Sequence, residues 1–171
     1  MQDIFSEDIG SGTPLVLVHG FLGSSEMWNL QIKFFKDNFR VIVPALPGFG
    51  KSNTLDSCDS IKCMAKAILD LLEKKEIKKF NLLGHSMGGM IVQEMTKLVS
   101  EKILKLIWYD TGPRRNIPRR FETIDQSREK LKLNGLEATA NRIAKSGLYI
   151  GRKQNIFIYV MKLVKKPQLK L

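Results

Sequence analysis

The stretch that decides the fold of this 171-residue chain reads Phe80-Asn81-Leu82-Leu83-Gly84-His85-Ser86-Met87-Gly88-Gly89. Residues 79–83 have the short apolar pattern of a buried strand, and residues 87–99 form a largely apolar segment of helical length. Between them stands a G-x-S-x-G motif, which is typical of a serine on a tight strand-to-helix turn. The residues two before and two after such a serine nearly touch, so Gly84 and Gly88 are expected because only glycine fits there.

A turn of this kind has a chemical consequence for Ser86. It lifts the serine hydroxyl above the sheet and holds it near a helix N-terminus, where developing negative charge is favoured. The backbone N–H of the next residue, Met87, then points at the reacting oxygen. The motif therefore predicts Ser86 as the nucleophile of an acyl transfer and Met87 as one oxyanion donor.

The remainder of the chain repeats the alternation of strands and helices. Further short apolar runs predict strands, and segments with apolar residues at helical spacing lie between them. This alternation predicts a three-layer α/β fold with a mostly parallel sheet and helices on both faces. The expected strands are 14–18, 40–43, 79–83 and 103–109, and the expected helices are 27–38, 60–74 and 87–99.

The sequence His19-Gly20-Phe21-Leu22-Gly23 follows the first clear strand directly. An acyl-transfer site needs a second backbone donor facing the substrate oxygen, and a turn with flanking glycines after a neighbouring strand can supply it. We expect this donor to be the N–H of Phe21. The ring of His19 is expected to brace neighbouring loops rather than to exchange protons.

Residues 45–52, Ala-Leu-Pro-Gly-Phe-Gly-Lys-Ser, satisfy a loose phosphate-loop pattern after a strand. A true phosphate loop runs straight into a helix whose N-terminal amides hold the phosphates. Residues 53–59 are polar and show no apolar periodicity, and Pro47 lacks an amide proton. A nucleotide site is therefore the less favoured interpretation of this loop.

Three motifs in this order, H-G-F-L-G-S-S (19–25), L-P-G-F-G-K-S (46–52) and G-H-S-M-G-G (84–89), resemble the α/β-hydrolase superfamily. The resemblance is greatest to its small esterases, lactonases and non-haem haloperoxidase-like members. It covers residues 3–112 and extends weakly to about residue 144. It implies serine-nucleophile cleavage of a small-molecule carboxylic ester or lactone by a Ser/His/Asp triad, with no metal and no organic cofactor. Ser86 matches the family nucleophile, and Phe21 and Met87 match the oxyanion donors.

The sequence departs from this family in the residues that should activate the serine. Family members place the acid and the histidine in later strands and loops, so the fold is expected to be incomplete at its C-terminal side. Only His19 and His85 occur in the chain, and neither is placed to act as the base. Asp110 follows the last clear strand and is expected to make a loop or cap contact. Turnover by this chain is therefore expected to be weak or absent.

The formal net charge of +11 is concentrated at one end of the chain. Eight basic residues and no acidic one lie in 138–171, while 20 basic residues oppose 17 acidic ones in 1–137. We expect a hydrolase core over 1–112, the start of a cap or lid over 113–146 and a basic, atypical tail over 147–171. The tail is interpreted either as a frame-shifted end of a longer gene or as a genuine segment that docks a partner supplying the rest.

Two further functions stay open beside the hydrolase. The missing base is consistent with a non-catalytic binding module of the same fold, and the basic tail could bind nucleic acid or an anionic surface. Nucleic acid is nevertheless not expected as a partner, because the core itself is nearly balanced in charge. Oligomeric state is open, since an unfinished sheet leaves an edge that invites association.

The cysteines and the start of the chain bear on the compartment of the protein. Cys58 and Cys63 are expected to be free thiols, because a spacing of five on a helix does not bring the two side chains together. Residues 1–9 are acidic without an apolar core, so no signal peptide is expected. The late apolar run 156–160 is too short to span a bilayer. The sequence thus predicts a cytoplasmic protein.

Overall fold

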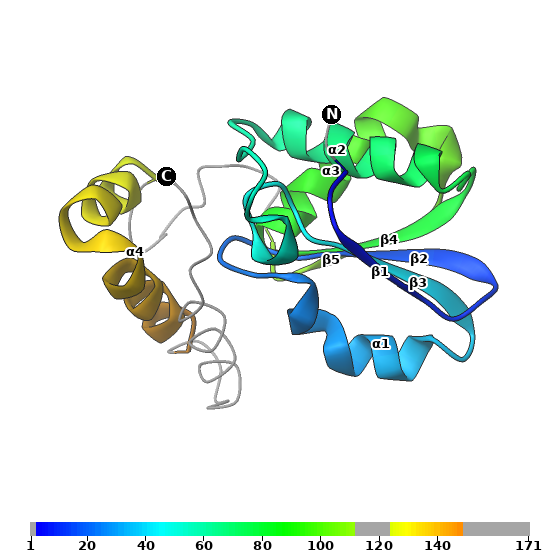
Figure 1. The fold of residues 1–171 in the computed structure, drawn as a ribbon, viewed down its shortest axis with the longest axis horizontal. Coiled ribbons are helices and arrows are strands. Elements are labelled where there is room, and N and C mark those ends of the chain that lie inside the picture. The colour runs from blue at the N-terminus through cyan, green and yellow to red at the C-terminus, as the bar shows by residue number, and fades with distance from the viewer. Residues whose placement is uncertain (1–2, 112–123, 149–171) are drawn as a thin grey trace. The chain divides into compact units, whose positions relative to one another are not determined.

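The computed structural model describes residues 3–111 and 124–148 of the chain. Contacts divide the chain into two compact units; residues 3–111 belong to the first and 124–148 to the second. In the first unit a five-stranded sheet separates helix α1 (Asn29–Phe35) from helices α2 (Ile61–Lys74) and α3 (Met87–Val99), as Figure 1 shows. The three-layer α/β arrangement predicted from the sequence is confirmed.

The strand order of the sheet is β1-β3-β2-β4-β5. All neighbouring strands are parallel except β1, which runs antiparallel to β3. Strands β2 and β4 are hydrogen-bonded neighbours and pair Val18 with Gly84, so the segments that follow them leave the sheet at the same edge. The strand bounds are β1 Ser6–Ile9, β2 Thr13–Val18, β3 Phe39–Pro44, β4 Phe80–His85 and β5 Ile103–Tyr109.

The helices begin close to where the sequence placed them. Ser60 caps α2, and its Oγ accepts a hydrogen bond from the backbone N–H of Cys63 at 3.2 Å. Helix α1 is shorter than the expected 27–38, because a 3₁₀ turn over Ser25–Trp28 precedes it. Two more 3₁₀ turns cover Gly50–Ser52 and Ser100–Lys102.

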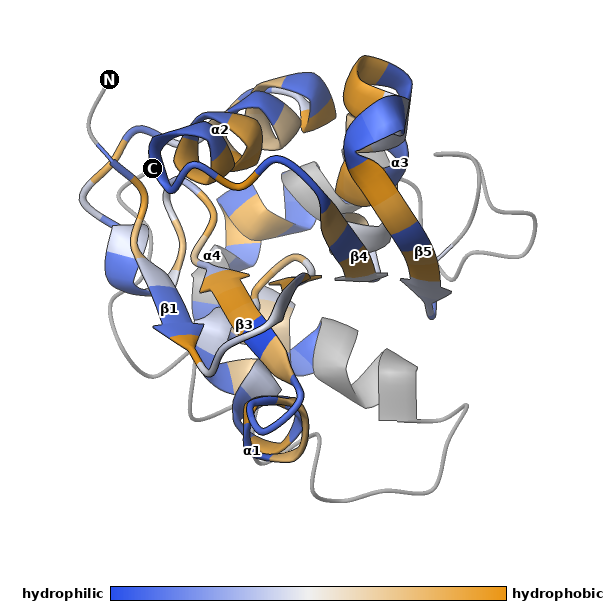
Figure 2. Cartoon of the chain, turned by 90° about the vertical axis from the view of Figure 1, so that its right-hand side faces the viewer, coloured by the Kyte–Doolittle hydropathy of each residue, from blue (hydrophilic) through white to orange (hydrophobic). Residues whose placement is uncertain are grey.

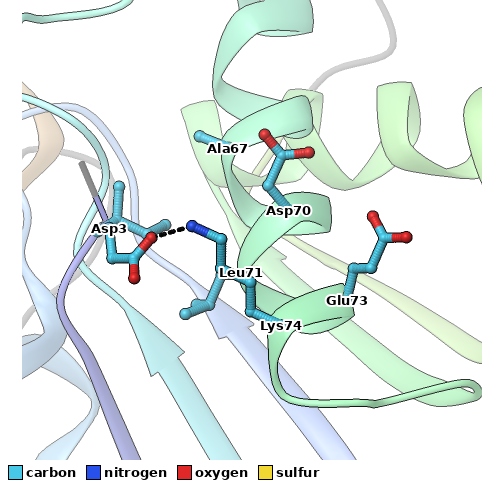
Figure 3. Close-up of a pocket in the computed structure, with 7 residues that line it drawn as sticks. Asp3, Ala67, Asp70, Leu71, Glu73 and Lys74 are labelled. Carbon is cyan, nitrogen blue, oxygen red and sulfur yellow. Dashed lines mark hydrogen bonds and ion pairs between the residues drawn. The ribbon is translucent and has the colours of Figure 1, made fainter. Parts of the chain in front are cut away.

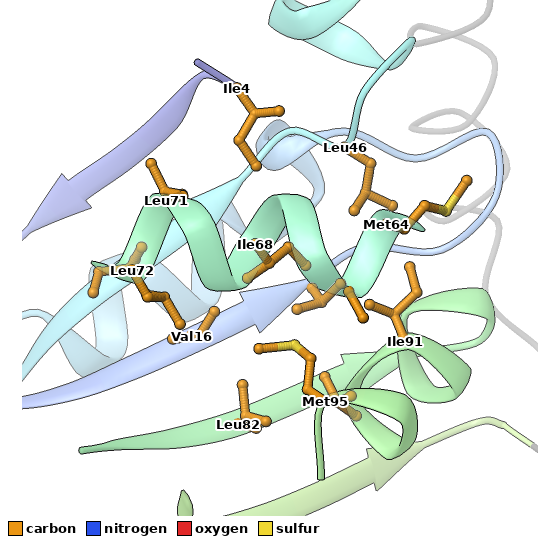
Figure 4. Close-up of a cluster of buried hydrophobic side chains, with 14 of the residues drawn as sticks. Ile4, Val16, Leu46, Met64, Ile68, Leu71, Leu72, Leu82, Ile91 and Met95 are labelled. Atoms are coloured by element: carbon orange, nitrogen blue, oxygen red, sulfur yellow. The ribbon is translucent and has the colours of Figure 1, made fainter. Parts of the chain in front are cut away.

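Two apolar clusters fill the two sides of the sheet. The larger lies between the sheet and α2 and α3, where Ile68 and Met95 are completely buried (Figure 4). The smaller lies on the α1 side and includes Trp28 and Ile32. Because both faces are covered, the central strands carry apolar side chains on both sides, which explains their continuous hydrophobic runs. Figure 2 shows these runs as orange segments.

Strand β1 was not expected from the sequence, and charged side chains attach it to the sheet. The carboxylate of Asp8 accepts hydrogen bonds from Arg40 at 2.8 and 2.9 Å and from Lys75 at 2.8 Å, while Lys51 bonds Glu7 at 2.9 Å. The Arg40 hydrogen bond is the largest cause that lowers the pKa of Asp8 to about 2. The short, mostly polar strand β1 thus pairs with β3 through its backbone and is held at the edge of the sheet by ion pairs of Glu7 and Asp8.

The expectation of free thiols is wrong, because Cys58 and Cys63 are joined by a disulfide with their Cα atoms 5.6 Å apart. The error was to place both residues on one helix. Helix α2 begins only at Ile61, so Cys58 lies on the preceding loop and can fold back over the first turn. The cysteines therefore no longer support a reducing compartment.

Helix α4 (Ile124–Leu148) lies almost wholly within the stretch 113–146 that was expected to begin a cap or lid, and a kink at Gly135 interrupts it. Residues 112–123 and 149–171 lie outside the described part of the chain, so the boundaries at 112/113 and 146/147 and the nature of the tail stay predictions. Among the residues that the structure describes, no helix is long and apolar enough to cross a membrane.

We predict that replacing Ile68 by Ala lowers the free energy of unfolding by about 2–5 kcal/mol, because it leaves a cavity in a fully buried position. The matched control is Leu30→Ala on α1, where the side chain is 74% exposed and the expected change is within about 0.5 kcal/mol. Urea denaturation followed by circular dichroism measures both. Equal effects in the two variants would contradict the assigned core.

Candidate active site

Ser86 lies at the junction of β4 and α3 with backbone angles φ 53° and ψ −118°. A positive φ is uncommon for a residue other than glycine and marks local strain. The turn is held by two backbone hydrogen bonds, since the N–H of Ser86 donates to the carbonyl of Tyr109 at 3.1 Å and the N–H of Gly89 donates to the carbonyl of Ser86 at 2.9 Å. The strand, sharp turn and helix expected around Ser86 are therefore present.

Both glycines of the motif lie where backbone meets backbone. A Cβ built on Gly84 would come within 2.3 Å of the carbonyl oxygen of Gly88. A Cβ built on Gly88 would come equally close, at 2.3 Å, to the carbonyl oxygen of Val18 at the end of β2. The first contact is the one expected from the motif. The second shows that Gly88 also lets α3 approach the neighbouring strand.

The loop after β2 lies directly beside the serine. A Cβ built on Gly20 would stand 3.0 Å from the Cβ of Ser86. Phe21 is 47% exposed and packs edge-on against Phe49, with ring centroids 6.1 Å apart. Met87 is the first residue of α3, so its N–H belongs to the unbonded N-terminal turn. The loop that carries Phe21 and the β4–α3 junction that carries Ser86 and Met87 therefore adjoin each other.

His19 is completely buried and acts as a brace, as predicted. Its Nδ1 lies 2.9 Å from the carbonyl oxygen of Gly20, and the backbone N–H of Leu46 donates to Nε2 at 3.0 Å. These partners require the neutral tautomer with the proton on Nδ1. Burial lowers the pKa of His19 to about 4, which keeps the ring uncharged at neutral pH. Both nitrogens are already bonded, so His19 has no free position for a proton from Ser86.

The side chain of His85 contacts residues at and just beyond the end of β5. Its Nε2 lies 3.7 Å from a carboxylate oxygen of Asp110, and its ring packs against Tyr109 at 5.4 Å. Within residues 3–111 and 124–148, Nδ1 is buried without a hydrogen-bond partner. Burial lowers the pKa of His85 and outweighs the opposing effect of Asp110. Asp110 makes the loop contact expected of it, at a positive φ of 48°.

A family model described as the alpha/beta hydrolase fold matches residues 13–146. This range holds the elbow, the loop after β2 and most of the sheet. The chain belongs to the α/β-hydrolase family.

An esterase is among the relatives of this α/β-hydrolase, and solved esterase and lactonase structures share its fold. The chain is 32% identical over 103 residues to esterase YbfF of Escherichia coli (strain K12). The matched residues make up 60% of this chain and 40% of that protein. The solved structure of a thermophilic esterase from Thermogutta terrifontis matches with a TM-score of 0.82 and 26% identity, covering 96% of this chain and 62% of that one. An enol-lactonase from Burkholderia xenovorans LB400 shares the fold with a TM-score of 0.81, at 19% identity over 96% of this chain and 65% of the enol-lactonase.

The chain therefore spans two fifths of the length of the curated esterase and 62–65% of the two solved structures. The range that the family model matches, residues 13–146, includes every site residue predicted above. Activity, substrate and partners of this α/β-hydrolase are accordingly taken up as proposals below.

The loop over residues 45–52 does not have the form of a phosphate loop. It leads into the 3₁₀ turn Gly50–Ser52, and α2 begins only at Ile61. Leu46 bonds the ring of His19, and Phe49 packs against that ring with centroids 5.6 Å apart. The loop thus supports the segment that carries Phe21.

The turn after β5 also holds the elbow, which sequence reasoning missed. The Tyr109 carbonyl accepts the hydrogen bond from Ser86 described above. The side chain of Thr111 packs against the start of α3, because a Cβ built on Gly89 would lie 2.3 Å from the Cγ2 of Thr111. A carbonyl acceptor has no side-chain signature in a sequence. The one available signal was the second glycine, Gly89, directly after the motif.

A pocket of about 460 Å³ lies elsewhere in the first unit, between the N-terminal segment and α2. Its lining includes Asp3, Lys74 and Leu71, and Figure 3 shows the ion pair between Asp3 and Lys74. None of its lining residues belongs to the elbow or to the loop after β2. Within the described residues, no group of three or more His, Cys, Asp or Glu side chains could hold a metal ion.

We predict that His19 makes the folded state sensitive to acid. Its pKa is about 4 in the folded state against an ordinary value of 6.5, so the unfolded chain binds the proton first. The stability contributed by neutral His19 is complete above pH 6.5 and is lost as the pH falls toward and through about 4. Urea unfolding at several pH values should show this slope, and His19→Gln should flatten it. An unchanged slope in His19→Gln would contradict the assignment.

Proposed function

We propose that this chain carries the acyl-transfer half of a serine hydrolase for small carboxylic esters or lactones. In this reaction the Oγ of Ser86 attacks the carbonyl carbon, the alcohol leaves with a proton, and an acyl-serine forms. The N–H groups of Phe21 and Met87 would stabilise the oxyanion. The observation that carries the proposal is the position of Ser86, on a strained turn at the N-terminus of α3 with Gly20 against its side chain.

We further propose that turnover by the 171-residue chain is weak or absent. Both nitrogens of His19 are bonded, and His85 is drawn toward Asp110. A serine without a base retains only the contribution of the oxyanion donors, on the order of 10³–10⁴ over the uncatalysed reaction in other serine hydrolases. The same observation favours a second candidate, a non-catalytic binding module that holds a small apolar ligand.

Covalent labelling with a fluorophosphonate tests the assigned nucleophile. With imidazole added as the base, the Oγ of Ser86 should attack phosphorus and expel fluoride, and this labelling should be lost in Ser86→Ala. The matched control is Ser100→Ala, which removes an exposed serine just beyond the other end of α3 and should label like the wild type. Mass spectrometry of the labelled peptide identifies the site. Labelling that persists in Ser86→Ala would contradict the proposal.

Chemical rescue separates the hydrolase from the binding module. Added imidazole supplies the missing base, so it should raise hydrolysis of a p-nitrophenyl ester by the wild type at least about tenfold more than by Ser86→Ala. The Ser86→Ala variant accounts for direct attack by imidazole on the ester. Equal rates in the two proteins, together with saturable binding of an apolar ester analogue, would favour the binding module.

The remaining sequence-based expectations can be tested separately. A nucleic-acid or anionic-surface function through the basic tail rests on residues outside the described part of the chain; salt-dependent DNA binding would support it. A cytoplasmic location is a proposal that the disulfide does not favour. Alkylation in intact cells decides it, because cytoplasmic protein would carry Cys58 and Cys63 as thiols.

A further inference from the structure

The loop over residues 45–52, called the support loop below, contacts the loop after β2 at two separate points. The backbone N–H of Leu46 donates a hydrogen bond to the ring of His19 at 3.0 Å. A Cβ built on Gly50 would stand 2.8 Å from the Cβ of Ser24. Because packed protein interiors transmit strain, a movement of the support loop is passed on to the loop after β2, which lies beside the candidate nucleophile.

The segment that leads into α2 holds the support loop from its other side. A Cβ built on Gly48 would lie 2.9 Å from the Cβ of Ser57, so the two residues pack backbone against side chain. Residues 56–58 belong to no helix, strand or turn, so Ser57 is not fixed by secondary structure of its own. The next residue along the chain is Cys58, which the disulfide joins to Cys63 in the first turn of α2.

The helix end of this disulfide is a fixed point. Ser60 caps α2 by accepting a hydrogen bond from the backbone N–H of Cys63. Met64, the following residue, is buried in the larger apolar cluster (Figure 4). Cys58 is half-buried and packs against the same cluster from the loop. The sulfur–sulfur bond therefore holds the end of the loop segment, and with it Ser57, against the start of the helix.

We propose that the disulfide between Cys58 and Cys63 is a site of thiol–disulfide exchange, and that its redox state controls the position of the loop after β2. The substrate of this site is a dithiol. The oxidised pair keeps Ser57 against Gly48, whereas reduction releases residues 56–58 and loosens the support loop. The consequence for Ser86 rests on the proposed function, since the loop after β2 carries one of the proposed oxyanion donors.

The exchange can be written with every electron accounted for. A thiolate of the dithiol attacks the Sγ of Cys63, which is exposed, forms a mixed disulfide and expels Cys58 as a thiolate. The second thiolate of the dithiol then attacks its own sulfur in the mixed disulfide and expels Cys63. Two electrons pass to the cysteine pair, whose thiolates take up protons from water, and the dithiol becomes a cyclic disulfide.

Reduction should act locally and leave the fold intact. The disulfide closes only the short loop 58–63, and a short closed loop constrains the unfolded chain less than a long one. The cap of α2 by Ser60 does not depend on the sulfur–sulfur bond. The expected change is therefore confined to residues 56–58 and to the support loop that they contact.

Hydrogen exchange resolved by residue tests the proposal without relying on enzyme activity. Full reduction by dithiothreitol should speed exchange of the Leu46 amide at least about tenfold, while the amide of Leu82 in β4 stays unchanged. Cys63→Ser should exchange like the reduced wild type and should not respond to the reductant. Unchanged exchange at Leu46, or an equal increase at Leu82, would overturn the proposal.

A thermodynamic cycle tests the contact through which the disulfide acts. Gly48→Ala introduces strain at φ 82° and a clash with Ser57, and both should lower the urea midpoint of unfolding. Only the clash is relieved when residues 56–58 are released, so the midpoint shift should be about half as large after reduction. Gly12→Ala, at φ 98°, meets Asn38 instead and should shift the midpoint equally in both redox states. Equal shifts for Gly48→Ala would contradict the coupling.

Fluorophosphonate labelling of Ser86 measures the consequence at the candidate site. With imidazole as the base and the reductant removed, the oxidised chain should label at least about threefold faster than the reduced chain, and reoxidation should restore the rate. Cys63→Ser should label at the slow rate throughout. Equal rates in the two states would overturn the link to Ser86. No labelling in either state, with redox-dependent exchange at Leu46, would reject the proposed nucleophile and support the redox site.

Discussion

The close approach of α3 to the end of β2 is the contact on which the candidate site depends. The peptide at Gly88 lies so near the carbonyl of Val18 that even one methyl group would separate helix from strand. This approach fixes the start of α3, and with it the position of Ser86 relative to the loop that carries Phe21. A larger residue at 88 would shift the helix, and Ser86 would move away from the loop that carries Phe21.

The sheet and its helices could be predicted from the sequence because burial on both faces leaves continuous apolar runs in β2, β3, β4 and β5. The elbow could be predicted because its glycines have a steric cause. Strand β1 could not, since Ser6-Glu7-Asp8-Ile9 lacks apolar alternation and is held by partners distant in sequence. The disulfide was missed for a local reason: Cys58 was counted as helical, whereas it lies on the loop before α2.

At the candidate site, the placement of Ser86 depends on the backbone, whereas proton transfer depends on side chains from other segments. Backbone geometry places Ser86 on a sharp turn between β4 and α3, as the local pattern predicts, whereas the oxyanion roles of the Phe21 and Met87 amides stay predictions. Proton transfer needs a side chain brought in from elsewhere, and both histidines of the sequence are committed to other contacts. His19 joins two loops through its ring, whereas His85 faces the turn after β5.

The two edges of the sheet have opposite characters. Strand β1 is short and carries paired charges on Glu7 and Asp8, which discourages any further strand from adding there. Strand β5 is apolar along its end. A strand added at β1 would have to displace these ion pairs, so this edge of the sheet protects the folded chain against edge-to-edge aggregation.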